Sequence, residues 1–100
     1  MKKMAATAAD EYASWFRCLS DGTRVQILSL IARSDGPLTV GDIVDAVGKS
    51  QSTVSRHLQV LAAECFVFRE PDGVRTLVRA NPDCMTELPR AAAEIMGATS

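Results

Sequence analysis

The sequence has no long apolar run, few cysteines and a single histidine. No apolar stretch approaches the roughly 20 residues that span a bilayer, so we expect neither a membrane-spanning helix nor a membrane partner. Asp10 and Glu11 interrupt the apolar residues 4–9, which argues against a signal peptide. Three cysteines are a sparse and odd set for a secreted disulfide scaffold, so we expect a reducing, cytoplasmic location.

Net charge and catalytic groups are equally scarce. The 100 residues carry a formal charge of −1, from 11 Lys and Arg against 12 Asp and Glu. Taken over the whole chain, this balance argues mildly against nucleic acid as a partner. One histidine among scattered carboxylates gives no nucleophile or acid–base constellation, so we expect neither an enzyme nor an organic cofactor. The length fits one domain over residues 1–100.

What the chain does have is helical apolar periodicity in its first two thirds. Residues 8–19 carry an apolar stripe at i, i+3, i+4 and i+7, made of Tyr12, Trp15, Phe16 and Leu19. Ser20 or Asp21 can cap a second, central helix, which residues 34–37 end. Residues 39–42 resemble a capping box, with Asp42 in the usual Glu position, and they open a short third helix that Gly48 closes.

A fourth helix follows after only two residues, with Ser50 as its cap, and two helices joined by such a tight turn match a helix-turn-helix. Its apolar residues are spaced i, i+4 and i+7: Val54, Leu58 and Leu61. Its opposite face is polar and almost free of acid, and it holds Gln51, Ser52, Ser55, Arg56 and Gln59. A face that is merely solvated would usually carry Glu and Lys, so the composition favours a surface that contacts a partner.

The period becomes strand-like after this helix. Residues 66–69 and 76–79 flank the pair Asp72-Gly73, which predicts a hairpin turn. A hairpin centred on this pair places Cys65 opposite Ala80. The predicted fold class is therefore mostly α with a β-hairpin wing, in the order α-α-α-α-β-β-α, which is a winged helix-turn-helix.

A last helix is predicted to start with Asn81 as its cap and Pro82 in its first turn. Pro89 would fall inside this helix and predicts a kink or a late start. The helix carries a second terminal apolar stripe, made of Met85, Leu88, Ala92 and Ile95.

Two segments make the chain similar to a known family. Residues 16–28, FRCLSDGTRVQIL, and residues 49–61, KSQSTVSRHLQVL, resemble the ArsR/SmtB family of bacterial metal-sensing repressors, and the resemblance covers about residues 10–97. The sequence departs from the family at Gly22, where Pro is usual, and at Cys65, in a turn that is typically Ala-Gly. The resemblance implies a homodimeric repressor that binds operator DNA and is released by a metal ion.

The predicted DNA contacts follow from the way a helix in the major groove reads base edges with the side chains of its N-terminal half. The candidates are Ser50, Gln51, Ser52, Thr53, Ser55, Arg56 and His57, with Arg75 of the wing. A half-buried packing role is an equally good interpretation of His57. Residues 49–79 carry five basic and three acidic side chains, a balance of +2 that leaves −3 for the rest of the chain.

The two terminal apolar stripes predict a homodimer built from the first and last helices, because one small domain cannot cover both of them. A palindromic operator requires the same symmetry. The predicted interface residues are Tyr12, Trp15, Phe16, Leu88 and Ile95. The alternative is that both stripes pack only within the chain.

The metal sites most common in the family are absent. Residues 39–42 hold no C-x-C pair and no histidine follows His57, which argues against zinc, nickel or cobalt sensing through those sites. Cys18, Cys65 and Cys84 remain as predicted ligands. The hairpin places the last two near one another, and the family fold packs the first helix beside the last, in the same chain or across the dimer.

Three thiols without histidine suit a thiophilic metal or metalloid inducer. We expect Hg(II) in preference to As(III), with Pb(II) or Cd(II) as further candidates, and the chain resembles actinobacterial mercury regulators of this fold. Three alternatives stay open: each cysteine is a small buried hydrophobe, Cys65 and Cys84 form a redox-sensing disulfide, or the domain binds protein and no DNA.

Overall fold

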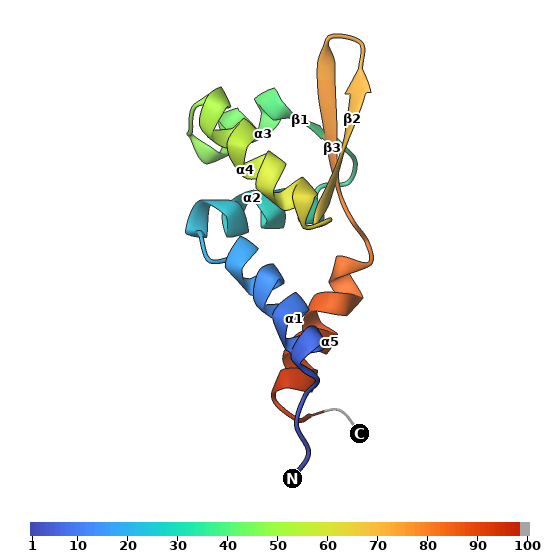
Figure 1. The fold of residues 1–100 in the computed structure, drawn as a ribbon. Helices are drawn as coiled ribbons and strands as arrows, with labels where there is room; N and C mark the ends of the chain where they lie inside the picture. The colour runs from blue at the N-terminus through green and yellow to red at the C-terminus, as the bar shows by residue number, and fades with distance from the viewer. Residues whose placement is uncertain (99–100) are drawn as a thin grey trace.

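The computed structural model describes residues 1–98. Its elements, shown in Figure 1, follow the predicted order with one addition, a two-residue strand before the third helix. They are α1 (Ala6–Cys18), α2 (Gly22–Arg33), β1 (Leu38–Thr39), α3 (Val40–Val47), α4 (Gln51–Ala63), β2 (Val67–Asp72), β3 (Arg75–Ala80) and α5 (Cys84–Ile95). The strand β1 was not predicted because two half-buried residues give no alternating pattern.

Side-chain caps start the three helices of the central body as the sequence predicts. The Asp21 carboxylate accepts hydrogen bonds from the backbone N–H groups of Thr23 and Arg24, at 2.8 and 3.3 Å. Thr39 and Asp42 form the reciprocal capping box of α3, with bonds of 2.9 and 3.0 Å. Ser50 caps α4, where its Oγ accepts from the Thr53 N–H at 3.2 Å. Local sequence therefore fixes where these helices begin.

The three strands form an antiparallel sheet in the order β1-β3-β2. The hairpin register differs from the prediction, because Ala80 pairs with Val67 and not with Cys65. The cause is the turn, which lies one residue later than predicted and consists of Gly73 and Val74. Gly73 has a φ of 63°, whereas Val74 is not among the residues with positive φ. Glycine at the first central position is the pattern of a type II′ turn.

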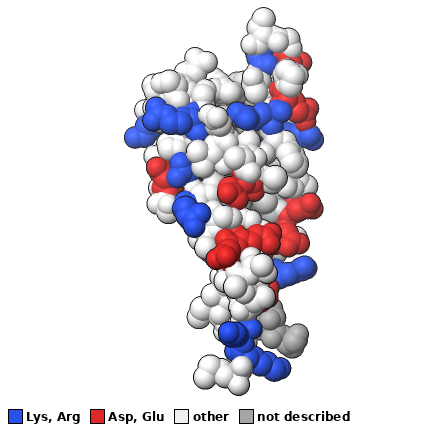
Figure 2. All heavy atoms as spheres, in the orientation of Figure 1, with Lys and Arg blue, Asp and Glu red and all other residues white. Residues whose placement is uncertain are grey.

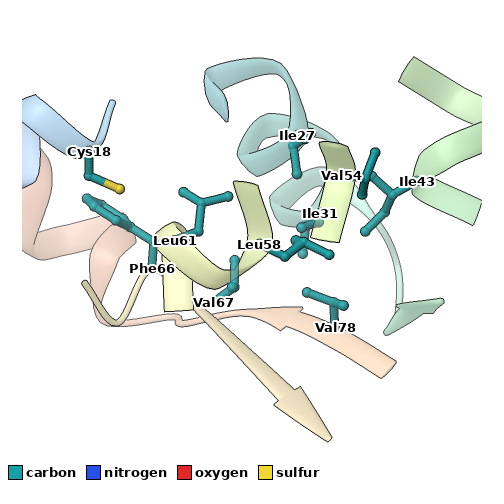
Figure 3. Close-up of a cluster of buried hydrophobic side chains, with 10 residues drawn as sticks. All are labelled: Cys18, Ile27, Ile31, Ile43, Val54, Leu58, Leu61, Phe66, Val67 and Val78. Carbon is teal, nitrogen blue, oxygen red and sulfur yellow. The ribbon is translucent and has the colours of Figure 1, made fainter. Parts of the chain in front are cut away.

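A single apolar core joins α2, α3, α4 and the sheet (Figure 3). The predicted inner face of α4 is confirmed, since Val54, Leu58 and Leu61 are all buried. They pack with Ile27, Ile31, Ile43, Phe66, Val67 and Val78, and Cys18 closes the end of the cluster nearest α1. This core holds the helix-turn-helix and the base of the wing in one rigid unit.

The terminal helices α1 and α5 project from this body as a two-helix stalk, so that the molecule measures 54 × 23 × 19 Å (Figure 1). The Tyr12 hydroxyl of α1 donates a hydrogen bond to the Glu94 carboxylate of α5. No helix within residues 1–98 is long and apolar enough to cross a membrane.

The predicted start of α5 is wrong, because the N-cap is Asp83, without a side-chain cap bond, and the α-helix begins at Cys84. The Asn81 side chain accepts from the Asp83 N–H at 3.0 Å and so stabilises the turn of residues 82 and 83 that precedes the helix. Pro89 lies inside α5, where it leaves the carbonyl of Met85 without its helical donor.

Candidate DNA-binding surface and thiol pocket

The turn between α3 and α4 presents one face of α4 to solvent. Gly48 ends α3 in the left-handed region with a φ of 69°, a conformation that glycine adopts without steric cost. Ser50 starts α4 two residues later. The side chains that face outward from this helix are Gln51, Ser52, Ser55, Arg56 and Gln59, and α4 itself contains no carboxylate. Such a face offers donors and acceptors for base edges and a cation for phosphate.

Hydroxyl groups pre-organise the first turn of α4. The Ser50 hydroxyl lies 2.9 Å from that of Thr53 and 3.2 Å from that of Ser52. Ser50 therefore has a structural task, because it caps the helix and also orients two neighbouring hydroxyls. Gln51 and Arg56 are the long side chains on the exposed face of the N-terminal half of α4.

His57 lies on the inner side of α4. It is half-buried, and its Nδ1 lies 3.3 Å from the Nη1 of Arg24 in α2. Arg24 in turn donates from Nε to the carbonyl of Cys18 at 2.6 Å. These contacts correspond to the packing interpretation of His57.

Arg75 of the wing is engaged by an acid of its own hairpin. Its Nη2 lies 3.0 Å from Oδ2 of Asp72, with both side chains at least half exposed. Arg79 forms a similar exposed ion pair with Glu70. Arg75 and Arg79 are therefore each partly neutralised by a carboxylate of the same hairpin. In Figure 2, basic side chains gather on the upper body and acidic side chains form a patch nearer the stalk.

Two of the three cysteines share a pocket of about 340 Å³ at the junction of the stalk, α4 and the wing. Cys65 is exposed and Cys84 is half-buried. The Cys84 thiol donates a hydrogen bond to the Cys65 carbonyl at 3.5 Å, and Asn81 Nδ2 donates to the same carbonyl at 2.9 Å. The expected proximity of Cys65 and Cys84 thus holds, although through the turn at Asn81 rather than through strand pairing.

Cys18 does not join them. It is buried, its thiol lies 3.9 Å from the Val60 carbonyl, and it points toward the ring of Phe66 (Figure 3). Within residues 1–98, His, Cys, Asp and Glu form no group of three or more that could hold a metal ion. The expectation of three converging thiols is therefore not met in the single chain, and the reason is that Cys18 is part of the core.

Cys65 occupies a backbone position that favours glycine. Its φ is 61°, and it is the one non-glycine residue with positive φ among those described. The Cys65 N–H bonds to the Ala62 carbonyl and the Phe66 N–H to the Leu61 carbonyl, which is the Schellman pattern at the end of α4. The same pattern ends α5 with Gly97 at the equivalent place. A side chain in this conformation costs roughly 1–2 kcal/mol, so the thiol is held there at an energetic cost.

Acidic side chains surround the thiol pair, and sequence reasoning missed them. The pocket is lined by Glu11, Glu64, Asp83 and Glu87. Burial raises the pKa of the Cys84 thiol, and the negative charges of Asp83, Cys65 and Glu87 raise it further. Burial likewise raises the pKa of Cys18. The i, i+4 spacing of Asp83 and Glu87 next to Cys84 was the signal available in the sequence.

The predicted interface residues divide into two groups. Trp15 and Leu88 are half-buried and pack against the core of their own chain. Phe16 and Ile95 are 41% and 47% exposed, and together with Tyr12 they line an apolar hollow of about 400 Å³ between α1 and α5. This hollow is therefore an apolar and aromatic part of the stalk surface.

Sequence comparison places this architecture among bacterial regulators. Residues 21–64 match the family described as bacterial regulatory protein, arsR family. A transcriptional regulator of the helix-turn-helix type from Mycobacterium tuberculosis, Rv2034, is 34% identical over 73% of this chain and 66% of its own length. The arsenic resistance transcriptional regulator ArsR1 of Pseudomonas putida is 35% identical, over 68% of this chain and 52% of its own length.

A third relative, the probable mercury resistance operon repressor of Streptomyces lividans, is 37% identical over 71% of this chain and 55% of its own length. The matched segments thus span about half to two thirds of these relatives.

Solved structures agree with the sequence relatives. An ArsR-like transcriptional regulator from Rhodococcus has a TM-score of 0.77 and 27% identity, covering 93% of this chain and 85% of its own. A homodimeric winged helix-turn-helix DNA-binding domain from Mycobacterium bovis has a TM-score of 0.71 and 27% identity, covering 97% of this chain and 91% of its own. The mostly helical fold with a hairpin wing, predicted from the sequence, is confirmed.

Proposed function

Since this chain belongs to the arsR family of bacterial regulatory proteins, we propose that it is a repressor that binds operator DNA as a homodimer and is released by a thiophilic metal ion. Proteins of this family regulate transcription and are not enzymes. The observation that carries the DNA-binding part is the capped helix α4, whose exposed face holds hydroxyl, amide and guanidinium groups and no carboxylate.

In this proposal the N-terminal half of α4 enters the major groove. Gln51 is suited to adenine and Arg56 to guanine or a phosphate, while Ser52, Thr53 and Ser55 reach either base edges or phosphates. The N-terminal amides around Ser50 suit a phosphate oxygen. Arg75 contacts a DNA phosphate when its ion pair with Asp72 breaks. His57 positions α4 through Arg24.

The homodimer is supported by the stalk. The exposed apolar residue Phe16 lies on α1 and Ile95 lies on α5. A second copy of the chain would bury both side chains away from water. The structural relative from Mycobacterium bovis is homodimeric. In this proposal the described residues 1–98 form one winged helix domain whose first and last helices dimerise, with Tyr12 at the edge of the interface. The last two residues of the predicted domain, 99 and 100, lie outside the described part of the chain.

Cys65 and Cys84 would hold the inducer, and Cys18 would not. Hg(II) is a soft ion that two thiolates can ligate in full, whereas inorganic As(III) has three ligand positions. Two neighbouring thiols therefore favour Hg(II). The four carboxylates of the pocket attract a dication. A relative is a probable mercury resistance operon repressor, and another is an arsenic resistance regulator.

The two thiols lie where the recognition helix α4 meets the stalk helix α5. Cys65 is the residue directly after the C-cap of α4, and Cys84 is the first residue of α5. Drawing their sulfur atoms together changes the angle between the recognition helix and the stalk. In a dimer the two recognition helices must lie about 34 Å apart to meet successive major grooves, so such a change lowers affinity for DNA. A coupling of about 1–3 kcal/mol is typical of such switches.

The DNA-binding test measures affinity for DNA from the upstream region of the chain's own gene at several salt concentrations. Arg56→Ala should weaken binding by about tenfold or more, while Arg90→Ala, which removes an exposed cation from α5, should leave it unchanged. Affinity should fall steeply with salt. Binding of Arg56→Ala at wild-type affinity contradicts the assignment of α4, and no DNA binding at all points to a protein-interaction module.

The inducer test adds mercuric chloride, arsenite, zinc chloride or hydrogen peroxide to the protein–DNA complex. Mercuric chloride should release wild type and Cys18→Ser but not Cys65→Ser or Cys84→Ser, whose binding without metal should be normal. Release by peroxide alone, with no effect of any metal, replaces this proposal by the thiol-redox alternative.

A further inference from the structure

A positively charged hollow of about 420 Å³ lies where the end of α1 meets the last turns of α4. The charged side chains in its lining are Arg17 of α1, Arg24 of α2 and Glu64, the C-cap of α4. Two guanidinium groups and one carboxylate thus border it, on a chain whose formal net charge is −1. A local excess of positive charge attracts an anion.

The exposed stripe of α4 leads into this hollow. Ser55, Gln59 and Ala63 are all exposed and lie four residues apart, so they follow one another along one face of the helix. Gln59 and Ala63 both line the hollow, as does Arg17 in the last turn of α1. The surface proposed to contact DNA therefore continues past α4 onto α1.

The two arginines of the hollow are held differently. Arg24 is half-buried and fixed by two contacts, from Nε to the Cys18 carbonyl at 2.6 Å and from Nη1 to Nδ1 of His57 at 3.3 Å. Arg17 is exposed, and within residues 1–98 its guanidinium has no ion-pair partner, unlike the wing arginines. One cation is therefore preorganised, and the other has its donors available for a ligand.

The length of α4 indicates what this hollow would meet on DNA. A helix of 13 residues is about 20 Å long, whereas the major groove is about 12 Å wide. The N-terminal half of a recognition helix contacts the base edges, so its C-terminal end lies against the strand that borders the groove. The charged groups of that strand are its phosphates.

We propose that the hollow binds a phosphate of the DNA backbone, with Arg17 as the direct contact and Gln59 and Arg24 in support. This inference rests on the proposed function, since it adds a phosphate site to the same DNA-binding surface. A guanidinium forms paired hydrogen bonds to phosphate oxygens, and the Gln59 amide supplies a further donor. Such a contact fixes the orientation of the protein on the duplex and carries no sequence information.

The test measures affinity for a labelled duplex from the upstream region of the chain's own gene, and for a scrambled duplex, at several salt concentrations. Arg17→Ala should weaken binding to both by about three- to tenfold and lower the salt slope by about one per protomer. Arg17→Lys keeps the charge and should keep the slope. The control is Arg33→Ala, which should change neither quantity. Arg33 is also the last-turn cation of its helix, but it lies about 14 Å from Arg24 along α2.

Neutral methylphosphonate groups, introduced one at a time into the duplex, identify the phosphate. At one position in each half-site the neutral group should weaken binding of wild type and Arg33→Ala several-fold. The same group should leave binding of Arg17→Ala unchanged, because that variant has already lost the contact.

Glu64 provides a test of opposite sign. Its carboxylate repels a phosphate in the hollow, so Glu64→Gln should strengthen DNA binding by about two- to threefold. Glu11→Gln makes the same charge change in the thiol pocket but not in the hollow, and it should leave the affinity unchanged.

Wild-type affinity and salt slope in Arg17→Ala overturn the proposal, as do equal gains for Glu64→Gln and Glu11→Gln. A shift of Arg17→Ala from dimer to monomer in sedimentation assigns Arg17 to the contact between two copies and also overturns it. Failure of the proposed function is a separate result. It shows as an absence of DNA binding by wild type, which removes both proposals, whereas an unchanged Arg17→Ala beside a binding wild type removes only this one.

Discussion

Arg24 of α2 and His57 of α4 are joined side chain to side chain, with Nη1 of the arginine 3.3 Å from Nδ1 of the histidine. The same guanidinium bonds through Nε to the Cys18 carbonyl at the end of α1. A cation at the C-terminus of a helix is also favoured by the helix dipole. One side chain thus ties the stalk, the central helix and the recognition helix together.

Arg24→Ala should therefore destabilise the protein. Hydrogen bonds that involve a charged group contribute about 1.5–3 kcal/mol each, and part of this is recovered by water at a half-buried site. We expect a loss of at least about 1 kcal/mol and a Tm lower by about 4 °C or more. Thermal unfolding measures it, with Arg33→Ala, an exposed arginine of the same helix, as the control. An unchanged Tm contradicts the structural role of Arg24.

Cys65→Gly should stabilise the protein. Glycine relieves the strain of a side chain at a φ of 61°, and its greater freedom in the unfolded chain cancels only part of that gain. The expected net effect is about 0.5–1 kcal/mol, or a Tm raised by about 2–8 °C. Cys65→Ala keeps the strain and should not raise the Tm. The gain should come with complete loss of thiol ligation.

Much of the fold could be predicted because its signals are local. Asp21, Thr39 and Ser50 start helices through bonds to residues two or three positions away, and the residues that form such caps are visible in sequence. The buried spacing of Val54, Leu58 and Leu61 is equally local. The turn was misplaced by one residue because Asp-Gly fits a type I′ turn and Gly-Val a type II′ turn, and both contain Gly73.

The candidate site was harder to predict because it depends on distant contacts. Nothing local distinguishes Cys18, which the core buries, from Cys84, which meets the C-terminal turn of α4. His57 borders the polar face of α4 on one side and Arg24 on the other. Only the tertiary packing decides whether its side chain turns to solvent or packs inside the chain. Glu11 lines the thiol pocket only because the tertiary fold places α1 beside it.

Asp72→Asn should strengthen DNA binding. Removing this carboxylate frees Arg75, whose ion pair with it is exposed and worth at most about 1 kcal/mol. We expect an affinity gain of up to about fivefold and a steeper dependence on salt. Asp10→Asn makes the same charge change on α1 and serves as the control. In an Arg75→Ala background the gain should vanish; its persistence there would mean that the wing arginine does not contact DNA.

Stability should fall in acid because of the helix caps. Hydrogen bonds from the Arg24 and Thr23 amides lower the pKa of Asp21, and bonds from Thr39 lower that of Asp42. Because the pKa of each carboxyl is lowered in the folded state, its contribution to the free energy of unfolding is present above the unfolded pKa near 3.8. That contribution is lost as the pH falls through the folded pKa.

Urea unfolding of Asp21→Asn measures this contribution. The variant should be less stable than wild type at neutral pH, and the two should converge in acid as the pH falls through the lowered pKa of the Asp21 carboxyl. Asp45→Asn, with the same charge change outside a cap, should show no such convergence. A difference that stays constant with pH contradicts the capping assignment.

The three thiols should react with iodoacetamide in an order set by exposure and charge. Cys65 is exposed and should react first, Cys84 is half-buried with a raised pKa and should react more slowly, and buried Cys18 should react last. Asp83→Asn removes the negative charge that contributes most to the raised pKa of Cys84, after burial. It should therefore increase the thiolate fraction and speed the reaction of Cys84 at neutral pH, without changing Cys65 or Cys18 to the same degree. Peptide mass mapping over time gives each rate, and an unaltered Cys84 rate in Asp83→Asn would show that burial alone governs this thiol.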